Sequence, residues 1–204
     1  RVRSKEELLL PETIGFWSGK FKPRGRRLKV YGAPSSGVHS NGFTLIRKAF
    51  DLDPKRPAGS KKRLGQYQRQ LGCTLGEELL KPTYIYHRLI KKLRKKYRIV
   101  GLVHVTGGGL IENPPRVMPK ECAMRIDLGT WEIPPIFDLI NKKGKVGRSE
   151  MLGVFNCGLG MLIITPDDLC EERLPLVGEV ERTEWVNHKD STTLFTGGQD
   201  LFSL

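Results

Sequence analysis

Three consecutive glycines at positions 107, 108 and 109 most constrain how this chain can fold. They follow the apolar run 99–105, and a strand is expected to end there because glycine offers no side chain to pack within a sheet. The bare N–H groups of such a run can point together toward an anion, as in phosphate-binding loops. A tight turn that tolerates positive φ explains the glycines equally well. The triplet therefore predicts a sharp strand end, with an anion site as one of two interpretations.

A second polar cluster lies between an apolar run and a predicted helix. Residues 35–42 read Ser-Ser-Gly-Val-His-Ser-Asn-Gly, and the helix is expected over 42–50. Free N–H donors and the positive end of the helix dipole favour a phosphate or carboxylate there. Ser40 or Asn41, taken alone, is better explained as a helix cap, but capping does not require the whole octet. Both clusters follow apolar strands, so we expect them to converge on one anion site at a shared edge of the sheet.

The composition is that of one folded domain. Of the 204 residues, 38% are hydrophobic, which is enough to bury a core. No apolar stretch approaches the roughly 20 residues that span a bilayer, and residues 1–7 lack the apolar centre of a signal peptide. The four cysteines show none of the spacings of zinc sites, so we expect free thiols, a buried Cys157 and no metal site. These features predict a soluble, cytoplasmic protein.

The formal net charge of +13 is concentrated in three basic clusters. They lie at 20–29, 55–69 and 88–98, and no acidic residue occurs between Glu78 and Glu112. Such a surface raises the local concentration of polyanions, so RNA is one candidate partner. For 88–96 the favoured alternative is a solvated helix face. Basic residues do not by themselves indicate nucleic acid, because phosphorylated small molecules are anions too.

Apolar periodicity and turn residues predict strands and helices in imperfect alternation. Ile85, Leu89, Leu93 and Tyr97 recur every four residues, which indicates an amphipathic helix with Lys and Arg on its outer face. Residues 51–70, interrupted by Pro and Gly, are expected to form a long surface loop. Further strands are expected at 13–19, 28–31, 99–105, 123–126 and 160–165, further helices at 42–50, 74–80, 134–141 and 147–155, and a turn or short helix at 112–117. The predicted class is α+β, a mixed β-sheet with helices packed on one face.

Five short sequence motifs, called words below, occur in an order that resembles one family. The words are Ser35-Ser36-Gly37-Val38-His39-Ser40-Asn41-Gly42 with Leu45-Ile46-Arg47-Lys48; Leu79-Leu80-Lys81-Pro82-Thr83 with Ile85-Tyr86; His104 to Gly109 with Glu112-Asn113 and Pro115-Arg116; Trp131 with Pro134-Pro135-Ile136-Phe137; and Glu150-Met151 with Phe155 to Met161. Together they make the chain similar to the C-terminal half of the phosphoribosylformylglycinamidine cyclo-ligase family, also called the AIR synthetase family. The chain departs from that family at Pro114 and Leu152, where Ile and Tyr are usual. The first half of the family, which holds ATP and magnesium, has no counterpart in the 204 residues.

The resemblance implies a fold like that of the AIR synthetase C-terminal domain. It also implies the ligase activity of the family, which is ATP-dependent closure of the imidazole ring in de novo purine biosynthesis. ATP and Mg²⁺ are the implied cofactors, bound mainly outside this chain, and the substrate is a phosphorylated small molecule. The resemblance further implies an ATP-binding N-terminal half or partner chain and a homodimer, and it predicts that this chain alone is inactive.

The candidate site residues come from the two polar clusters, read with the resemblance. Ring closure needs an activated formyl oxygen and an attacking amidine nitrogen, so the protein mainly positions groups and neutralises charge. His39 and His104 are the candidate catalytic residues because imidazole exchanges protons near neutral pH, with a structural hydrogen bond as the alternative for each. An asparagine amide suits an amidine because it both donates and accepts. The candidate substrate- and phosphate-binding residues are Ser35, Ser36, Ser40, Asn41, Thr106, Gly107, Gly108, Gly109, Glu112 and Asn113.

The expected organisation has three segments. Residues 1–13 are interpreted as an N-terminal extension or linker remnant, 14–181 as the AIR-synthetase-like domain and 182–204 as a divergent tail. Two functions from different classes remain. The first is the substrate-side half of the enzyme. The second is a non-catalytic binding or scaffold protein on the same fold, using its basic surface for RNA or a large assembly. The retained motifs favour the first, whereas the missing half and the excess charge favour the second.

Overall fold

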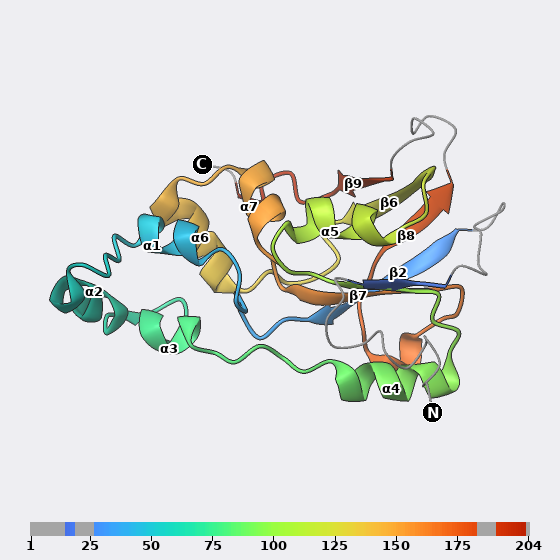
Figure 1. The fold of residues 1–204 in the computed structure, drawn as a ribbon, viewed down its shortest axis with the longest axis horizontal. Helices are drawn as coiled ribbons and strands as arrows, with labels where there is room; N and C mark the ends of the chain where they lie inside the picture. Colours follow the sequence, from blue (N-terminus) through green and yellow to red (C-terminus); the bar gives the residue numbers. More distant parts are fainter. Residues whose placement is uncertain (1–14, 19–26, 183–190, 203–204) are drawn as a thin grey trace, which may run out of the picture.

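The computed structural model describes residues 15–18, 27–182 and 191–202, and a seven-stranded sheet forms its centre (Figure 1). The strand order is β1-β5-β7-β2-β8-β6-β9. The strands are β1 (Gly15–Trp17), β2 (Leu28–Pro34), β5 (Gly101–His104), β6 (Cys122–Asp127), β7 (Leu159–Thr165), β8 (Leu176–Arg182) and β9 (Thr192–Thr196). Neighbouring strands are antiparallel except β6 and β9, which run parallel. The predicted mixed sheet is therefore confirmed.

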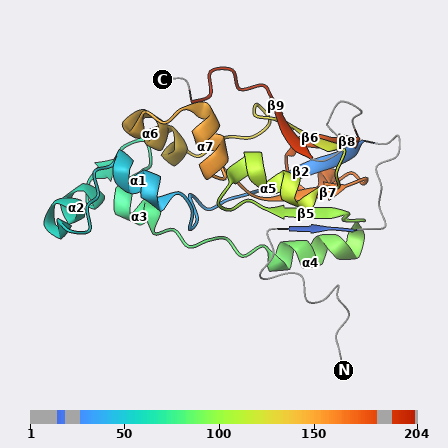
Figure 2. The same ribbon diagram turned by 45° about the horizontal axis from the view of Figure 1, so that its top comes forward.

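Helices cover the sheet because its central strands are apolar on both faces. In β7, Leu162 and Ile164 belong to one apolar cluster, and Ile163 belongs to a second cluster on the opposite face. Helix α5 (Gly109–Val117) and helix α7 (Arg148–Val154) lie over the first face, as Figures 1 and 2 show. Helix α4 (His87–Lys96) packs on the second face through Ile90 and Leu93, so the helices are not confined to one face. The predicted four-residue periodicity is confirmed for Leu89, Leu93 and Tyr97, which pack in this second cluster. Ile85 lies before α4 and is 79% exposed, so its place in the predicted apolar stripe is wrong.

Four further helices form one end of the molecule, beyond the ends of β2 and β7 (Figure 1). They are α1 (Phe43–Ala49), α2 (Pro57–Leu64), α3 (Leu75–Leu79) and α6 (Pro135–Gly144). A short hairpin of β3 (Tyr67–Gln68) and β4 (Cys73–Thr74) precedes α3, and a 3₁₀ turn, η1, covers Cys170–Glu172. Helix α3 begins with a capping box, which the spacing of Thr74 and Glu77 predicts: Glu77 N–H donates to Thr74 Oγ1 (3.2 Å) and Thr74 N–H donates to Glu77 Oε2 (2.8 Å). No helix in the described residues has the length and apolar character needed to cross a membrane.

The prediction of a long surface loop over 51–70 is wrong, because α2 and β3 lie within it. Pro57 stands in the first turn of α2, where its missing N–H costs nothing. The clustered positive charge is relieved by ion pairs of Arg56 with Asp53 and of Arg63 with Asp51. Ser60 fixes the entry to the helix, since its Oγ accepts from Asp53 N–H (2.8 Å) and donates to Asp53 O (2.9 Å).

The described part of the C-terminal segment packs onto the sheet. Strand β9 pairs in parallel with β6, and Phe202 is buried in the main core. Thr193 Oγ1 donates to Ile111 O (3.3 Å) and Ser191 Oγ donates to Pro115 O (2.7 Å), both on α5. The boundary predicted at 181/182 stays a prediction. The predicted extension 1–13, most of the basic cluster 20–29 and both ends of the predicted strand 13–19 lie outside the described residues.

Candidate anion-binding site at one end of the sheet

The ends of β2 and β5 bring the two predicted loops together. Both strands flank β7 and both are antiparallel to it, so they run in the same direction. Their last residues, Pro34 and His104, pair with Leu159 and Met161 at the start of β7. The loops that follow these strands are neighbours, since a Cβ placed on Gly107 would lie 3.8 Å from Asn41 Oδ1. The predicted convergence of the loops at one edge of the sheet is confirmed.

Asn113 holds the glycine loop from inside the protein. Its side chain is fully buried, accepts from Thr106 N–H (2.7 Å) and donates to Gly107 O (3.0 Å). Gly109 has a φ of +55°, and a Cβ there would lie 2.1 Å from a backbone oxygen of α7, so only glycine lets α5 begin so close to α7. Gly109 N–H donates to Thr106 O (2.9 Å). The N–H groups of Gly107 and Gly108 have no hydrogen-bond partner in the described part of the chain.

Asn156 holds the serine loop in the same way. Its Oδ1 accepts from Ser35 Oγ and from Gly158 N–H, each at 2.9 Å, and its Nδ2 donates to Gly37 O (2.9 Å). The side chain is fully buried. The hydroxyl of Ser35 is therefore committed to the loop. Both loops depend on a buried amide that satisfies the backbone where the regular strand hydrogen bonds end.

Helix α1 begins without a side-chain cap, which corrects the expectation that Ser40 or Asn41 caps it. The N-cap residue is Gly42 at φ +72°, and no side-chain hydrogen bond closes the first turn. Glycine has no side chain that could make this bond, because the cap position falls one residue later than expected. No hydrogen bond to the side chain of Ser40 or Asn41 occurs among the described residues, so both remain available to a ligand.

His39 is a neutral, buried ring. Ser36 N–H donates to its Nε2 (3.2 Å), so the ring proton sits on Nδ1, which is buried and has no partner in the described structure. Burial, reinforced by the nearby His104, lowers the pKa of His39 to about 4. A pKa this far below neutrality favours the structural alternative for His39, and its catalytic role stays a prediction. Its Nδ1–H stays unpaired inside the described part of the protein.

Tyr86 lies between the two histidines. Its ring centroid is 6.3 Å from that of His39 and 6.1 Å from that of His104. Its hydroxyl donates to Pro34 O (2.8 Å), at the end of β2, and burial raises the pKa of this phenol. Burial also lowers the pKa of His104, which is half-buried. The three rings thus form an uncharged wall beside the two loops at neutral pH.

The structure separates the predicted site residues into two groups. Ser40, Asn41, Gly107 and Gly108 offer unused donors, whereas the unpaired Nδ1–H of His39 is buried. His104 ends the strand that leads into the glycine loop. The others are committed elsewhere: Ser35, Gly109 and Asn113 to the loops, Thr106 through its backbone, Ser36 by an Oγ bond to Pro82 O (2.7 Å), and Glu112 by an exposed ion pair with Arg116.

Sequence reasoning missed two residues that shape the site, Asn156 and Tyr86. Both lie inside the recognised words, so the words were the available signal. The described residues contain no group of three or more His, Cys, Asp or Glu side chains that could hold a metal ion. Cys157 is fully buried, as predicted, and burial raises the pKa of its thiol.

Comparisons with known proteins identify relatives of this chain. Residues 28–186 match the model of the family described as AIR synthase related protein, C-terminal domain. Phosphoribosylformylglycinamidine cyclo-ligase of Bacillus cytotoxicus is 40% identical over 97% of this chain and 57% of its own length. The same-named protein of Bacillus cereus strain Q1 is 38% identical over 93% of this chain and 55% of its own length. The chain thus spans somewhat more than half the length of these curated relatives.

Among solved structures, thiamine monophosphate kinase from Aquifex aeolicus is similar with a TM-score of 0.47 and 15% identity. The similarity covers 86% of this chain and 52% of that one.

Proposed function

Because the chain belongs to the family of AIR synthase related proteins, as their C-terminal domain, we propose that it is the substrate-side half of a phosphoribosylformylglycinamidine cyclo-ligase. The proposed reaction closes an imidazole ring at the expense of ATP in purine biosynthesis. The observation that carries the proposal is the convergence of the two loops, which bring unused donors to one end of the sheet.

The donors suit a phosphorylated substrate. Gly107 and Gly108 present backbone N–H groups beside the start of α5, where the helix dipole adds a positive potential. Ser40 and Asn41 add side-chain donors from the other loop. The backbone N–H groups of the glycine loop are held in place by Asn113 before a ligand arrives, so they lose little freedom when they bind a phosphate.

His39 has a different task in this proposal. With its pKa near 4, the ring is neutral at pH 7, and it supports the serine loop by accepting a hydrogen bond from Ser36 N–H at its Nε2. His104, the last residue of β5, is the remaining imidazole for proton exchange when the substrate nitrogen attacks the formyl carbon. Asn113 acts on the substrate indirectly, by positioning the glycine loop.

The ATP-dependent step requires more than these residues. The described residues hold no cluster suited to Mg²⁺, so no step of the reaction is assigned to a metal on this chain. ATP activates the formyl oxygen in the proposed reaction, and we assign its binding to an ATP-binding half outside these 204 residues, in the same polypeptide or in a partner. The chain alone is then inactive, and the complete enzyme forms a dimer.

Two measurements test the proposal. Titration of the ¹⁵N-labelled chain with ribose 5-phosphate should shift the amide signals of Gly107, Gly108 and Asn41. Asn41→Ala should weaken this binding about tenfold, whereas Ser149→Ala, an exposed change on α7, should not. Shifts confined to α4 would contradict the site.

The second measurement is ATP-dependent formation of aminoimidazole ribonucleotide, expected only when the ATP-binding half of a relative is added. Turnover by the chain alone would contradict the claim of inactivity.

A further inference from the structure

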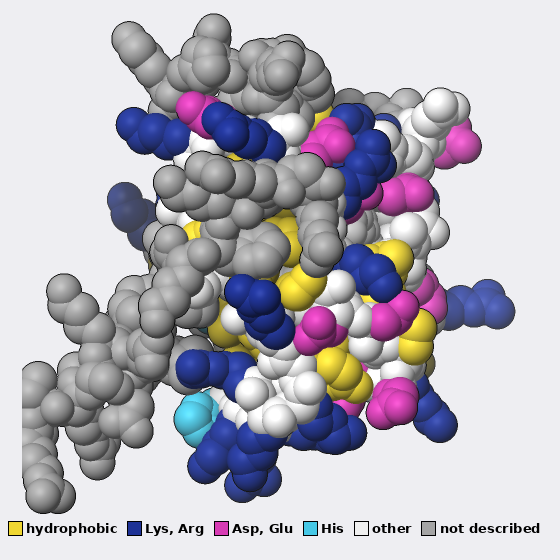
Figure 3. Space-filling view, turned by 90° about the vertical axis from the view of Figure 1, so that its right-hand side faces the viewer, with side chains coloured by type: hydrophobic (Ala, Val, Ile, Leu, Met, Phe, Trp, Pro, Cys, Tyr) yellow, Lys and Arg dark blue, Asp and Glu magenta, His cyan; other side chains and the backbone are white. Residues whose placement is uncertain are grey.

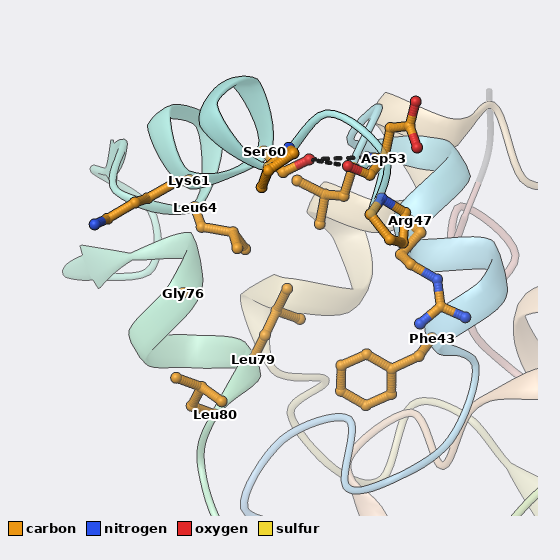
Figure 4. A pocket seen from close by; sticks show the side chains of 12 residues that line it. Phe43, Arg47, Asp53, Ser60, Lys61, Leu64, Gly76, Leu79 and Leu80 are labelled. Atoms are coloured by element: carbon orange, nitrogen blue, oxygen red, sulfur yellow. Dashed lines mark hydrogen bonds between the residues drawn. The ribbon is translucent and has the colours of Figure 1, made fainter.

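A groove lies between α1, α2 and α3 (Figure 4). These helices stand at the end of the molecule away from the sheet (Figure 1). Its volume is about 480 Å³. Apolar side chains form most of its lining: Phe43 from α1, Leu52 from the following loop, Leu64 from α2, and Leu79 and Leu80 from the end of α3. The groove shares no residue with the loops of the candidate anion site.

The apolar lining is poorly covered by the rest of the chain. Leu80 is 82% exposed, although it is a large aliphatic side chain. Helix α2 has no buried residue, and only its last one, Leu64, packs at the edge of the main core. An eight-residue helix is marginal in water unless an apolar face is covered. Leu80 and the half-buried Leu52 and Leu64 together form an apolar surface of the kind that marks a protein contact.

The charges around the groove are unbalanced. Its acidic residues are already engaged within the chain: Asp51 with Arg63, Asp53 with Arg56, and Glu77 in the capping box. Arg47 and Lys61 line the groove without an acidic partner among the described residues. Figure 4 shows the Arg47 guanidinium beside the Phe43 ring, whereas the Lys61 ammonium points away from the groove. A partner that brings carboxylates would complement this rim.

We propose that this groove docks an acidic amphipathic helix of a partner protein. Leu or Phe side chains on one face of that helix would contact Leu79, Leu80 and Phe43, and a carboxylate at its edge would pair with Arg47. A groove between helices accepts apolar anchors spaced at i, i+3, i+4 and i+7. A small polar ligand fits less well, because Asp53 and Lys61 point away from the groove and its polar groups do not converge on one place (Figure 4).

The test uses the full 204-residue chain and a fluorescein-labelled peptide of about 14 residues, four helical turns. The peptide carries Leu at the anchor positions and Glu on the opposite face, and fluorescence anisotropy measures its affinity. Arg47→Glu and Leu80→Glu should each weaken binding at least about tenfold. Lys91→Glu on α4 and Leu176→Glu on β8 are matched controls for charge and for loss of an exposed leucine, and they should change affinity less than about twofold. Amide shifts should map to α1, α2 and α3.

Other outcomes would overturn the proposal. Equal losses for Arg47→Glu and Lys91→Glu would show attraction by net charge alone. Undiminished binding of a peptide with Lys in place of Glu would remove the role of the basic rim. Displacement of the peptide by decanoate at a similar concentration would assign the groove to small amphiphilic anions. No binding of the Leu/Glu peptide would also overturn it.

Discussion

The end of the sheet and helix α4 offer an anion two different kinds of binding group. The sheet end contributes the backbone N–H groups of the glycine loop and the side chains of Ser40 and Asn41, on two loops that the buried amides of Asn113 and Asn156 hold by hydrogen bonds. Helix α4 contributes exposed Lys and Arg side chains, which gather along the lower edge of the view in Figure 3. Lys92 and Lys96 are already paired with the nearly buried carboxylate of Glu172.

The comparison teaches that charge and binding capacity are separate properties. Flexible surface cations are screened by water and salt, and they lose side-chain entropy when they bind. Fixed dipoles in a pre-shaped loop lose little, so a region without formal charge can be the better anion site. RNA binding would also need exposed aromatic rings for stacking. Near α4, Tyr86 is buried and Tyr97 half-buried, which leaves only Tyr84 exposed.

The largest expected effect tests how rigidly the glycine loop is held. Gly109→Ala should destabilise the protein by about 4 kcal/mol, because a Cβ would meet a backbone oxygen of α7 at a positive φ. Gly72→Ala is the matched control, since Gly72 also has a positive φ (+69°) but no atom within 4 Å of the added Cβ. It should cost about 1 kcal/mol. Urea denaturation measures both, and equal costs would mean that the contact between α5 and α7 does not fix the loop.

The next effect concerns the buried amide of the serine loop. Asn156→Ala should cost about 3 kcal/mol, because it leaves Gly158 N–H and Gly37 O buried without partners. Ser35→Ala removes only one of the hydrogen bonds of Asn156 and should cost about 1 kcal/mol. Urea denaturation of both variants measures the loss of unfolding free energy, and ribose 5-phosphate titrations measure the effect on phosphate affinity. Full phosphate affinity in a folded Asn156→Ala protein would separate the amide from the site.

A smaller effect is the pH dependence caused by His39. Its pKa is about 4 in the folded protein and near 6.5 when unfolded, so the unfolded state binds more protons between these values. Stability should therefore fall by about 2 kcal/mol as the pH drops from 7 to 4.5. His104, whose pKa is also lowered, acts in the same direction. The slope should flatten in His39→Asn, measured by urea denaturation at each pH, and an unchanged slope would rule out His39 as its source.

The smallest expected effect is on helix α4. Changing Arg88, Lys91, Lys92 and Lys95 to Gln should alter ribose 5-phosphate affinity less than about twofold, because these side chains lie away from the two loops. RNA affinity across a salt series should be feeble near physiological ionic strength in the parent and in the variant. Tight RNA binding that the variant abolishes would reverse the comparison and favour the scaffold function.

Part of the fold and part of the site could be predicted because their causes are local. The capping box at Thr74 and the four-residue spacing of α4 depend on neighbours within one or two turns. The meeting of the two loops at one sheet edge could be predicted because each loop is a polar cluster that follows an apolar strand. Helix α2 was missed because the ion pairs that relieve its charge, such as Arg63 with Asp51, depend on how the chain folds back.

The sequence by itself determined the family words, the mixed sheet and the two loops that meet at its edge. Only the tertiary structure decided which polar groups in those loops are free. Ser35 and Asn156 are 121 residues apart, yet their hydrogen bond removes the serine from the set of available donors. His39 is made neutral by burial against other elements, not by its own neighbours in sequence. Hydrogen-bond partners and desolvation depend on distance in space, so a linear pattern can name the residues of a site but cannot assign their states.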